Sequence, residues 1–463
     1  MGLGSVLNTA RDALTAQSYG LTVTGQNIAN ATTPGYVRRE ALLQTKALGT
    51  QAFGTVEVGG MRRATDLFTQ RKLYESIGLG ASAQEQNRQM SQVEALFNDF
   101  QGAGMSDALD QMFGSFSSLA ANPSDPATRI SVLDRAEAFA QRANDTSNAL
   151  ATQRNEMFAQ AQEAVKNVNE RAKDLARVEA EITIARSGGG DPSDLLQERE
   201  ELLRSMGEIV NVRVIEDGEG RAVVSAAGAT LVEGANFNQL SLDLDDNGAI
   251  RLWSSSASGA KSEVTRFLTG GTLGGLKEAR DVDLFKVQSQ LDDFVWGVGD
   301  AINQQHAAGV GLDGQTGRNI FDLGPGPGAA NTARSIKISA DVLGQPDRVA
   351  AASAAGSLPG GSDNAIELVR LGTRPILAGG TQSPGTAYGA LIADVGLRTK
   401  RAQDTAEHRE AVHAQIENLF QSQSGVSLNE EMIQLTKYQR AFEAASKVLT
   451  TVDGLLEDLM RAL

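Results

Sequence analysis

The chain has 463 residues, of which 41% are apolar, so it is long enough for about two to four domains with buried cores. It has no cysteine and three histidines, which excludes disulfides and thiolate chemistry and leaves little material for imidazole-based metal sites. Its net charge of −15 argues against nucleic acid or a membrane surface as a partner, and no apolar run approaches the roughly 18 residues of a membrane-spanning helix.

The first predicted element is a helix that begins close to the amino terminus. Its larger apolar residues recur every seven positions, at Leu7, Leu14, Leu21 and Ile28. The same stripe also carries Leu3, Ala10, Ala13 and Ala31. This heptad repeat predicts an α-helix with a narrow apolar seam, which needs a partner helix to cover it. Polar residues are mixed into the segment from its start, unlike in a cleaved leader, so we expect any export to follow another route.

A turn is predicted directly after this helix, at Thr33-Pro34-Gly35. Proline at the second turn position and glycine at the third are typical of a type II turn, in which the glycine adopts a positive φ. We expect this turn to end the helix and reverse the chain.

Long helical patterns dominate the middle of the chain. Residues 84–186 are helical with one break at 121–129, where two prolines and Ser124 mark the start of a new helix. Further helices are predicted at 193–207, 281–309 and 386–422. Together these segments predict an antiparallel helical bundle, which we assign to residues 46–210, 271–317 and 386–424.

Between these helices the apolar pattern changes to a period of two. Residues 211–270 alternate as strands do, and Asp217-Gly218 and Asn247-Gly248 favour tight hairpin turns. Residues 318–385 are rich in Gly, Pro and Ala. We expect 211–270 and 318–385 to form one β-rich outer domain, so the predicted fold class is mainly α with an inserted β-rich domain.

The last segment repeats the heptad pattern of the first. One heptad position holds Leu428, Leu435, Phe442, Leu449, Leu456 and Leu463, and the companion position holds Tyr438, Ala445, Val452 and Leu459. Glu431 interrupts the companion series. Ser427 and Glu430 form a Ser-x-x-Glu capping box, which places the helix start near residue 428. Because both ends carry heptads, we predict a terminal coiled-coil domain of residues 1–45 and 425–463, in preference to two unconnected amphipathic surface helices.

Motifs that could hold a ligand are weak. A calcium-loop opening is present at Asp243, Asp245, Asn247 and Gly248. Its twelfth position is Ser254 where glutamate is needed, and strands flank it, so a hairpin turn is the better interpretation. A dinucleotide-binding pattern is present at Gly309, Gly311 and Gly314. That pattern follows a predicted helix where a strand is required, so we expect no phosphate site there.

The sequence also offers no convincing set of catalytic residues. His408 and His413 lie five apart on a charged helix, which places them on different faces and is typical of solvated surface. Paired carboxylates such as Asp245-Asp246 and Asp292-Asp293 occur without a nucleophile beside them. We therefore predict no catalytic, cofactor-binding or metal-binding residue, and no enzymatic activity.

The two ends together resemble the terminal signatures of bacterial flagellar axial proteins. The amino-terminal segment is "GQNIANATTPGYVRRE" and the carboxyl-terminal one is "NEEMIQLTKYQRAFEAASKVLTTVD". Two further segments, "GGMRRATDLFTQRKLYES" and "VGDAINQQHAAGVGLDGQTGRNIFDL", resemble the first hook-associated protein family, the FlgK family. The positions that carry the amino-terminal signature are Asn27, Asn30, Thr33, Gly35 and Tyr36.

This resemblance implies a structural subunit of the hook-filament junction, required for filament assembly on the hook. It implies self-assembly into a ring, with the hook protein below and a second junction protein or filament-side protein above. It also implies flagellar type III export without a cleaved signal peptide, an extracellular location, and a cytoplasmic export chaperone bound to the carboxyl-terminal helix. Neither a cofactor, nucleic acid nor membrane insertion is implied.

Two alternatives remain open at this point. A hook or distal-rod subunit would share the terminal signatures, but we would not expect the helical segment 84–186 in a simple hook subunit. A secreted hydrolase acting on cell wall or matrix would need carboxylates that converge on a pocket in the β-rich region.

Overall fold

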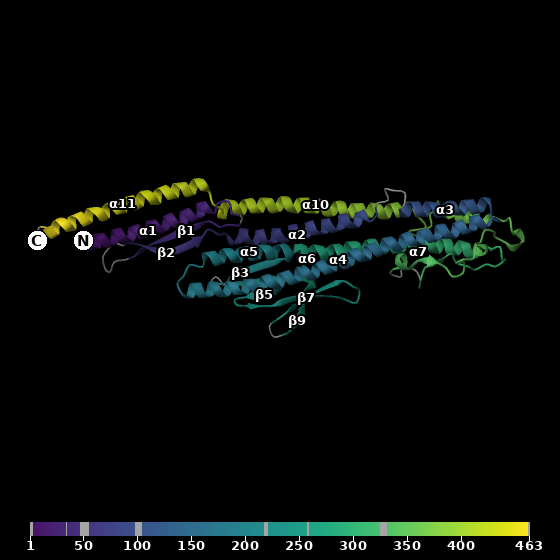
Figure 1. Cartoon of the computed structure of the whole chain (residues 1–463), viewed down its shortest axis with the longest axis horizontal. Helices are drawn as coiled ribbons and strands as arrows, with labels where there is room; N and C mark the ends of the chain where they lie inside the picture. The colour runs from purple at the N-terminus through teal and green to yellow at the C-terminus, as the bar shows by residue number, and fades with distance from the viewer. Residues whose placement is uncertain are drawn as a thin grey trace.

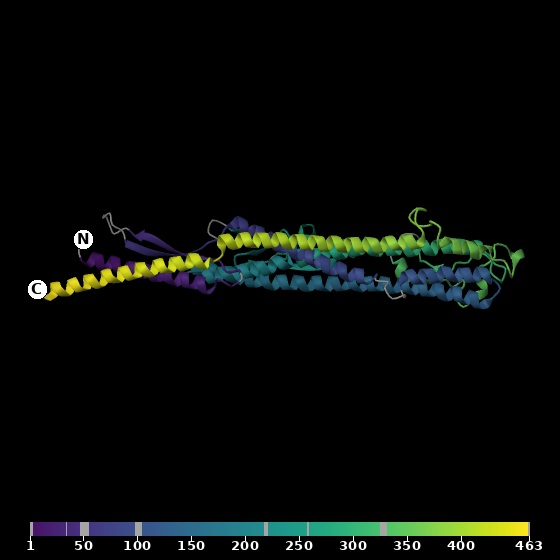
Figure 2. The ribbon, with the colours of Figure 1, turned by 90° about the horizontal axis from the view of Figure 1, so that it is seen from above.

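The computed structural model describes residues 3–33, 35–46, 55–97, 104–216, 221–256, 259–324 and 331–461. The molecule is an elongated rod with both chain ends at the same tip (Figures 1 and 2). Within these residues, none of the helices combines the length and the hydropathy that crossing a bilayer requires.

The tip that holds both ends consists of two helices and one hairpin, which we call the terminal module. Its elements are α1 (Leu3–Ala29), β1 (Arg39–Lys46), β2 (Thr55–Arg63) and α11 (Leu428–Arg461). Strands β1 and β2 pair antiparallel, and α1 packs against α11 on one side and the hairpin on the other. Figures 1 and 2 show α1 and α11 running in opposite directions side by side.

The rest of the rod is a bundle of long helices. These are α2 (Leu67–Ala95), α3 (Met105–Ala121), α4 (Pro126–Ser187), α5 (Ser193–Ile209), α6 (Gly271–Glu278), α7 (Leu284–Ala308) and α10 (Pro384–Ser424). The predicted break at 121–129 is confirmed: α3 ends at Ala121, Asp125 accepts a hydrogen bond from the Ala127 backbone N at 3.0 Å, and Pro126 opens α4. Proline fits this first turn because its missing N–H has no partner there.

One continuous apolar core runs along the bundle. It includes fully buried side chains such as Met112, Phe116, Phe139 and Leu291, and burial of each contributes about 1.5–3 kcal/mol. Among the described residues, none of the α1 or α11 side chains belongs to this core. The bundle is therefore the stable body of the molecule, and the terminal module has a separate, smaller interface.

Residues 211–270 form two small sheets on the side of the bundle. The four-stranded sheet has the order β3 (Val212–Glu216), β4 (Ala222–Ala226), β5 (Ala229–Glu233), β6 (Asn236–Phe237), and the three-stranded sheet β7 (Gln239–Leu244), β8 (Ile250–Ser255), β9 (Lys261–Glu263). The predicted hairpin turn between β7 and β8 is confirmed: Asp245 Oδ1 accepts from Asn247 N and Ala249 N, and Gly248 has φ +72°. The Asp217-Gly218 turn lies outside the described residues.

The prediction that 318–385 completes the same β-rich domain is wrong. In its described part the only strands of this segment are β10 (Phe321–Asp322) and β11 (Lys337–Ile338), which pair with each other. The segment also contains the short helices α8 (Thr332–Ser335) and α9 (Asp363–Leu371) and two 3-10 turns, Pro346–Arg348 and Ala355–Ser357. It lies at the tip of the rod opposite the chain ends, whereas the two sheets lie midway along (Figure 1).

Side chains of α7 explain why this irregular segment, which we call the distal lobe, needs no larger sheet. Asn303 donates to the Phe321 carbonyl and accepts from the backbone N of Ile320 and Phe321, each at 2.9 Å. His306 Nδ1 lies 2.7 Å from the Arg318 carbonyl, and its Nε2 accepts from Ala350 N at 2.8 Å. Helix side chains therefore satisfy backbone groups that a strand partner would satisfy elsewhere.

Candidate functional site

The contact between α1 and its neighbours runs along small residues. Helix α1 buries Ala10, Ala16, Gly20, Val23, Thr24 and Asn27. The predicted heptad residues Leu7, Leu14, Leu21 and Ile28 are only half-buried. The contact line therefore lies beside the predicted seam, because small side chains allow α11 and the hairpin to approach α1 on two sides.

On α11 the companion heptad series faces α1 as far as Val452, whereas its last member, Leu459, is 51% exposed. Glu431 and Val452 are buried, and Tyr438 and Ala445 are half-buried. Tyr438 lies directly over Gly20, where an added Cβ would come within 2.6 Å of the tyrosine ring. Glycine at position 20 is thus required for the two helices to pack this closely.

The other predicted heptad series of α11, which begins at Leu428, is only partly buried. Leu435, Leu449 and Leu456 are half-buried, whereas Phe442 is 37% exposed and Leu428 51% exposed. Leu428 and Phe442 are thus the described members of this series that keep the most exposed surface within one chain. Leu463 lies outside the described residues.

Asn27, the first signature residue, links three segments through its side-chain amide. Its Oδ1 accepts from the Tyr36 hydroxyl at 3.1 Å and from Arg39 N at 3.0 Å. Its Nδ2 donates to the Arg39 carbonyl at 2.8 Å and to Glu431 Oε2 at 3.0 Å. The amide thus uses both donors and accepts two bonds, so neither aspartate nor leucine could replace it.

The carboxylate of Glu431, at the start of α11, accepts hydrogen bonds from two other segments of the chain. It is 3% exposed and accepts from Arg38 Nε at 2.9 Å as well as from Asn27. The neighbouring Glu430 is 63% exposed and lies 3.5 Å from Arg38, so it points to the same arginine and not back to the helix start as in a full capping box. In the remaining half of that box, Glu430 N donates to Ser427 Oγ over a long distance of 3.5 Å. A buried polar group in an apolar heptad seam fixes the register of the helices.

The segment 35–39, which follows α1, is also bonded to the bundle. Arg39 donates to Asp194 at 2.8 Å, the Gln197 side chain donates to the Gly35 carbonyl at 3.0 Å, and Arg38 N donates to the Ser424 carbonyl at 2.8 Å. Burial raises the pKa of the Tyr36 phenol, which keeps it a neutral hydrogen-bond donor. We call this set of contacts between Asn27 and residues 35–39, 194–197 and 424–431 the joint.

The other signature residues shape the end of α1. Gly35 has φ +75°, and Tyr36 N donates to the Thr33 carbonyl at 3.2 Å, as a type II turn requires; Pro34 lies outside the described residues. Asn30 Nδ2 donates to the Gln26 carbonyl at 2.9 Å, and the Thr33 hydroxyl donates to Asn30 at 3.4 Å. These side chains terminate the helix.

Apolar side chains remain uncovered along α11. The larger exposed ones are Leu428, Met432, Ile433, Phe442, Val448, Leu455, Leu459 and Met460. We call these residues the exposed apolar set of α11. Such a surface on one helix is typical of an interface with other chains.

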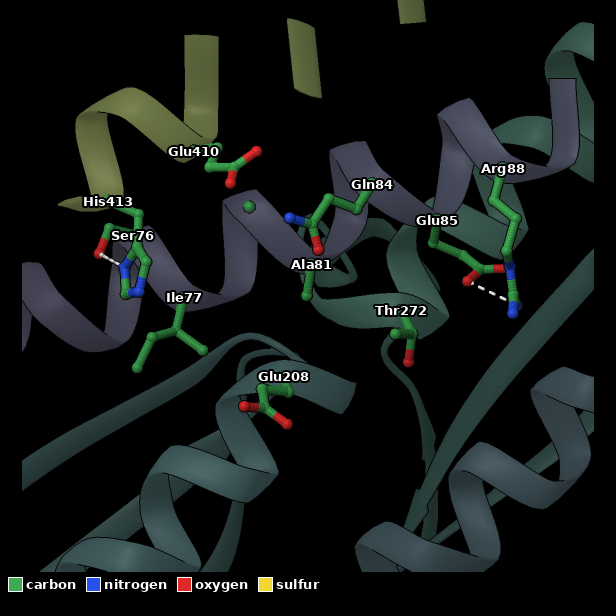
Figure 3. Close-up of a pocket in the computed structure, with 11 residues that line it drawn as sticks. Ser76, Ile77, Ala81, Gln84, Glu85, Arg88, Glu208, Thr272, Glu410 and His413 are labelled. Carbon is green, nitrogen blue, oxygen red and sulfur yellow. Dashed lines mark hydrogen bonds and ion pairs between the residues drawn. The ribbon is translucent and has the colours of Figure 1, made fainter. Parts of the chain in front are cut away.

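A cleft of about 480 Å³ lies between α2, α10 and the end of α5 (Figure 3). Ser76 Oγ and His413 Nδ1 lie 3.0 Å apart across it, so His413 is not the fully solvated residue that its sequence context predicts. The Ser76 hydroxyl donates to the Leu73 carbonyl at 2.8 Å, which commits its proton to the backbone. This pair therefore lacks the arrangement of a nucleophile activated by a base.

The described residues also contain no group of three or more His, Cys, Asp or Glu that could hold a metal ion. The sequence analysis overlooked Arg38 and Glu431 as members of the joint. The sequence signal for Glu431 was its position as the single carboxylate in an apolar heptad series, which it interrupts.

Comparisons with known proteins agree with this architecture. Residues 90–321 match the family model of the flagellar hook-associated protein FlgK helical domain. Residues 7–36 match the model of flagella basal body rod proteins, and residues 419–462 match the carboxyl-terminal model of the basal body rod FlgEFG proteins. The rod-type models cover only the ends, so the central match separates this chain from a simple rod or hook subunit.

Relatives align over the whole chain. Flagellar hook-associated protein 1 of Salmonella typhimurium is 24% identical over 99% of this chain and 100% of its own length. That of Bacillus subtilis is 25% identical over 99% of this chain and 98% of its own. A solved structure of the flagellar hook junction protein FlgK from Burkholderia pseudomallei has the same fold, with a TM-score of 0.68, 15% identity, and coverage of 76% of this chain and all of that one. The chain belongs to the FlgK family of flagellar hook-associated proteins and is a structural subunit of the hook-filament junction.

Proposed function

We propose that the terminal module is the part of this junction subunit that packs against other subunits of the flagellum. The observation that carries the proposal is the exposed apolar set of α11. The long bundle buries its apolar residues internally, whereas α11 covers only one face against α1. Neighbouring axial subunits would cover the remaining apolar face, and isolated helices gain most of their stability from such packing.

The assembly that we propose is a ring of this chain between two other axial proteins. The hook protein lies below the ring, and a second junction protein or a filament-side protein lies above it, so that filament growth requires the ring. The names of the relatives, flagellar hook-associated protein 1 and flagellar hook junction protein, support this position.

We further propose that the chain reaches this extracellular position through the flagellar type III export channel without a cleaved signal peptide. Before export the exposed apolar set of α11 lacks its neighbours and favours self-association. A cytoplasmic chaperone that holds α11 in an apolar groove would prevent this. We assign the chain no catalytic role, because the Ser76–His413 pair is the nearest approach to a catalytic pair in the cleft and its geometry is structural.

The test is a paired substitution on the exposed face of α11. The Leu455→Asp/Leu459→Asp variant should leave hooks without filaments in electron micrographs even in cells whose culture medium contains the secreted variant, because desolvating two carboxylates at a packed interface costs several kcal/mol. The matched control is Thr451→Asp, an exposed polar position on the same helix. Normal filaments in the leucine variant would show that this face of α11 is not an assembly interface.

A further inference from the structure

Charge is distributed unevenly along this chain. Residues 1–63 and 425–463 carry ten basic and nine acidic residues, whereas residues 64–424 carry 32 basic and 48 acidic ones. The strong negative charge therefore belongs to the bundle and its inserted lobes. The terminal module is nearly neutral, and four of its ten basic residues lie on α11.

Three of these positive charges form a stripe on α11. Lys437, Arg440 and Lys447 are all exposed, and within the described part of the chain none of them forms an ion pair. Arg440 lies nine residues after Glu431, about two and a half helical turns, so it points away from α1. Glu443 lies beside this cationic stripe without an ion pair to it.

Helix α10 carries carboxylates at the same spacing. Lys437, Arg440 and Lys447 are separated by three and then seven residues, and so are Glu407, Glu410 and Glu417. Glu407 and Glu410 are exposed, and Glu417 is half-buried, 3.4 Å from Arg204. Figures 1 and 2 show that α10 and α11 run in the same direction along the rod. A copy shifted by thirty residues, about 45 Å, would place the two series opposite each other in parallel.

The middle acidic residue of this series lines the cleft between α2, α10 and α5. Figure 3 shows Glu410 and Glu208 on opposite sides of the cleft, with Gln84 between them. In the structure Arg88 is paired with Glu85 at 2.7 Å, whereas Glu208 and Glu410 have no ion-pair partner among the described residues. The cleft therefore has uncompensated negative charge and room for a cationic side chain beside Ile77 and Ala81.

We propose that the cationic stripe of α11 docks in parallel on α10 of a second copy of this chain. Arg440 enters the cleft beside Glu410 and Glu208, Lys437 meets Glu407, and Lys447 meets Glu417. This contact deepens the proposed self-assembly, on which it rests, because it names a polar interface on the face of α11 turned away from α1. Arginine suits the central position since its planar guanidinium can bond two carboxylates at once.

Disulfide crosslinking in assembled flagella tests this register. The natural chain has no cysteine, so the full-length Glu410→Cys/Arg440→Cys variant contains only the designed pair. Within one chain these positions are roughly 45 Å apart along two consecutive helices, far beyond the ~7 Å Cα separation that a disulfide allows. Oxidised flagella from cells producing only this variant should therefore yield covalent multimers of the chain.

The matched control is Glu417→Cys/Arg440→Cys, which moves one partner by seven residues, about 10 Å, and should crosslink at least tenfold less. Assembled flagella that contain the variant without multimers, or with equal multimers in the control, would overturn the docking register. Absence of the wild-type chain from purified flagella would instead contradict the proposed function.

Charge exchange supplies an independent measurement. Lys437→Glu/Arg440→Glu and Glu407→Lys/Glu410→Lys should each reduce junction assembly at least tenfold, because attraction becomes repulsion in an exposed, salt-sensitive contact. The four substitutions combined in one chain should restore assembly. All four sites are exposed, and circular dichroism should show unchanged helix content. A combined variant that stays as defective as either half would overturn the pairing.

Discussion

Removal of the Glu431 carboxylate should release α11 from α1 while the bundle stays folded. In the Glu431→Ala variant, Asn27 Nδ2 and Arg38 Nε both lose the acceptor that they now meet at 3.0 and 2.9 Å. Asn27 remains buried after the change, so water does not readily replace its lost bond. The core of the bundle contains no α11 side chain among the described residues and should be unaffected.

The expected magnitude follows from these two bonds. A hydrogen bond to a charged group contributes about 1.5–3 kcal/mol, and two are lost. The Arg38 side chain is 25% exposed, so water recovers part of its share. We therefore expect α11 docking to weaken by about 3 kcal/mol, which corresponds to roughly a 100-fold larger undocked population.

Amide hydrogen exchange resolved along the chain measures this population directly. Exchange in α11 should accelerate roughly 100-fold in Glu431→Ala, while exchange in α4 and α7 stays the same. The matched control is Glu430→Ala, whose carboxylate is 63% exposed and 3.5 Å from Arg38, and which should change α11 exchange by only about twofold. Unchanged α11 exchange in Glu431→Ala, or equal acceleration throughout the bundle, would refute the assignment of Glu431 as the docking carboxylate.

Three further predictions concern separate regions. Gly20→Val should undock α11, because the new side chain collides with the Tyr438 ring, and Tyr438→Ala in the same chain should restore protected exchange; protection in Gly20→Val alone would contradict the close packing. Burial lowers the pKa of His306 to about 4, so the unfolded chain binds a proton below pH 6.5 that the folded chain does not, and stability should fall by up to roughly 3 kcal/mol from pH 6.5 to 4. The urea concentration at the midpoint of unfolding, measured against pH, should show this fall, and it should vary less with pH in the His306→Asn variant. The same pH dependence in the wild-type chain and the variant would argue against the role of His306. A fragment that ends near residue 425 should fail to co-purify with the export chaperone that the full chain retains, and retention would place that binding site elsewhere.

The helices and the pairing of the chain ends were predictable because their signals are local and periodic. The break before Pro126 and the turn at Asn247-Gly248 also follow from residues whose backbone preferences are strong. The family resemblance depended on the same terminal segments and on the helix that ends near 308, and the comparisons confirm it.

The parts that were missed depend on contacts between distant residues. Which face of α11 meets α1 is decided by Gly20 under Tyr438, a pair 418 residues apart, and no heptad count contains that information. The joint likewise needs Asn27 and Glu431 to meet across 404 positions. The distal lobe could not be predicted because its backbone partners are side chains of α7, not other strands.

The attachment of the distal lobe to α7 has a consequence for how this protein can change over evolutionary time. Asn303, His306 and Asp292 hold the lobe through its main-chain groups, and Asp292 does so by accepting from the backbone N of Asn331 and Ala333. Main-chain groups are the same for almost every amino acid, so the lobe can exchange most of its outer side chains without losing its anchors. Substitutions on the outer surface of this tip should therefore leave the lobe attached, whereas substitutions at Asp292, Asn303 or His306 of α7 should weaken its attachment.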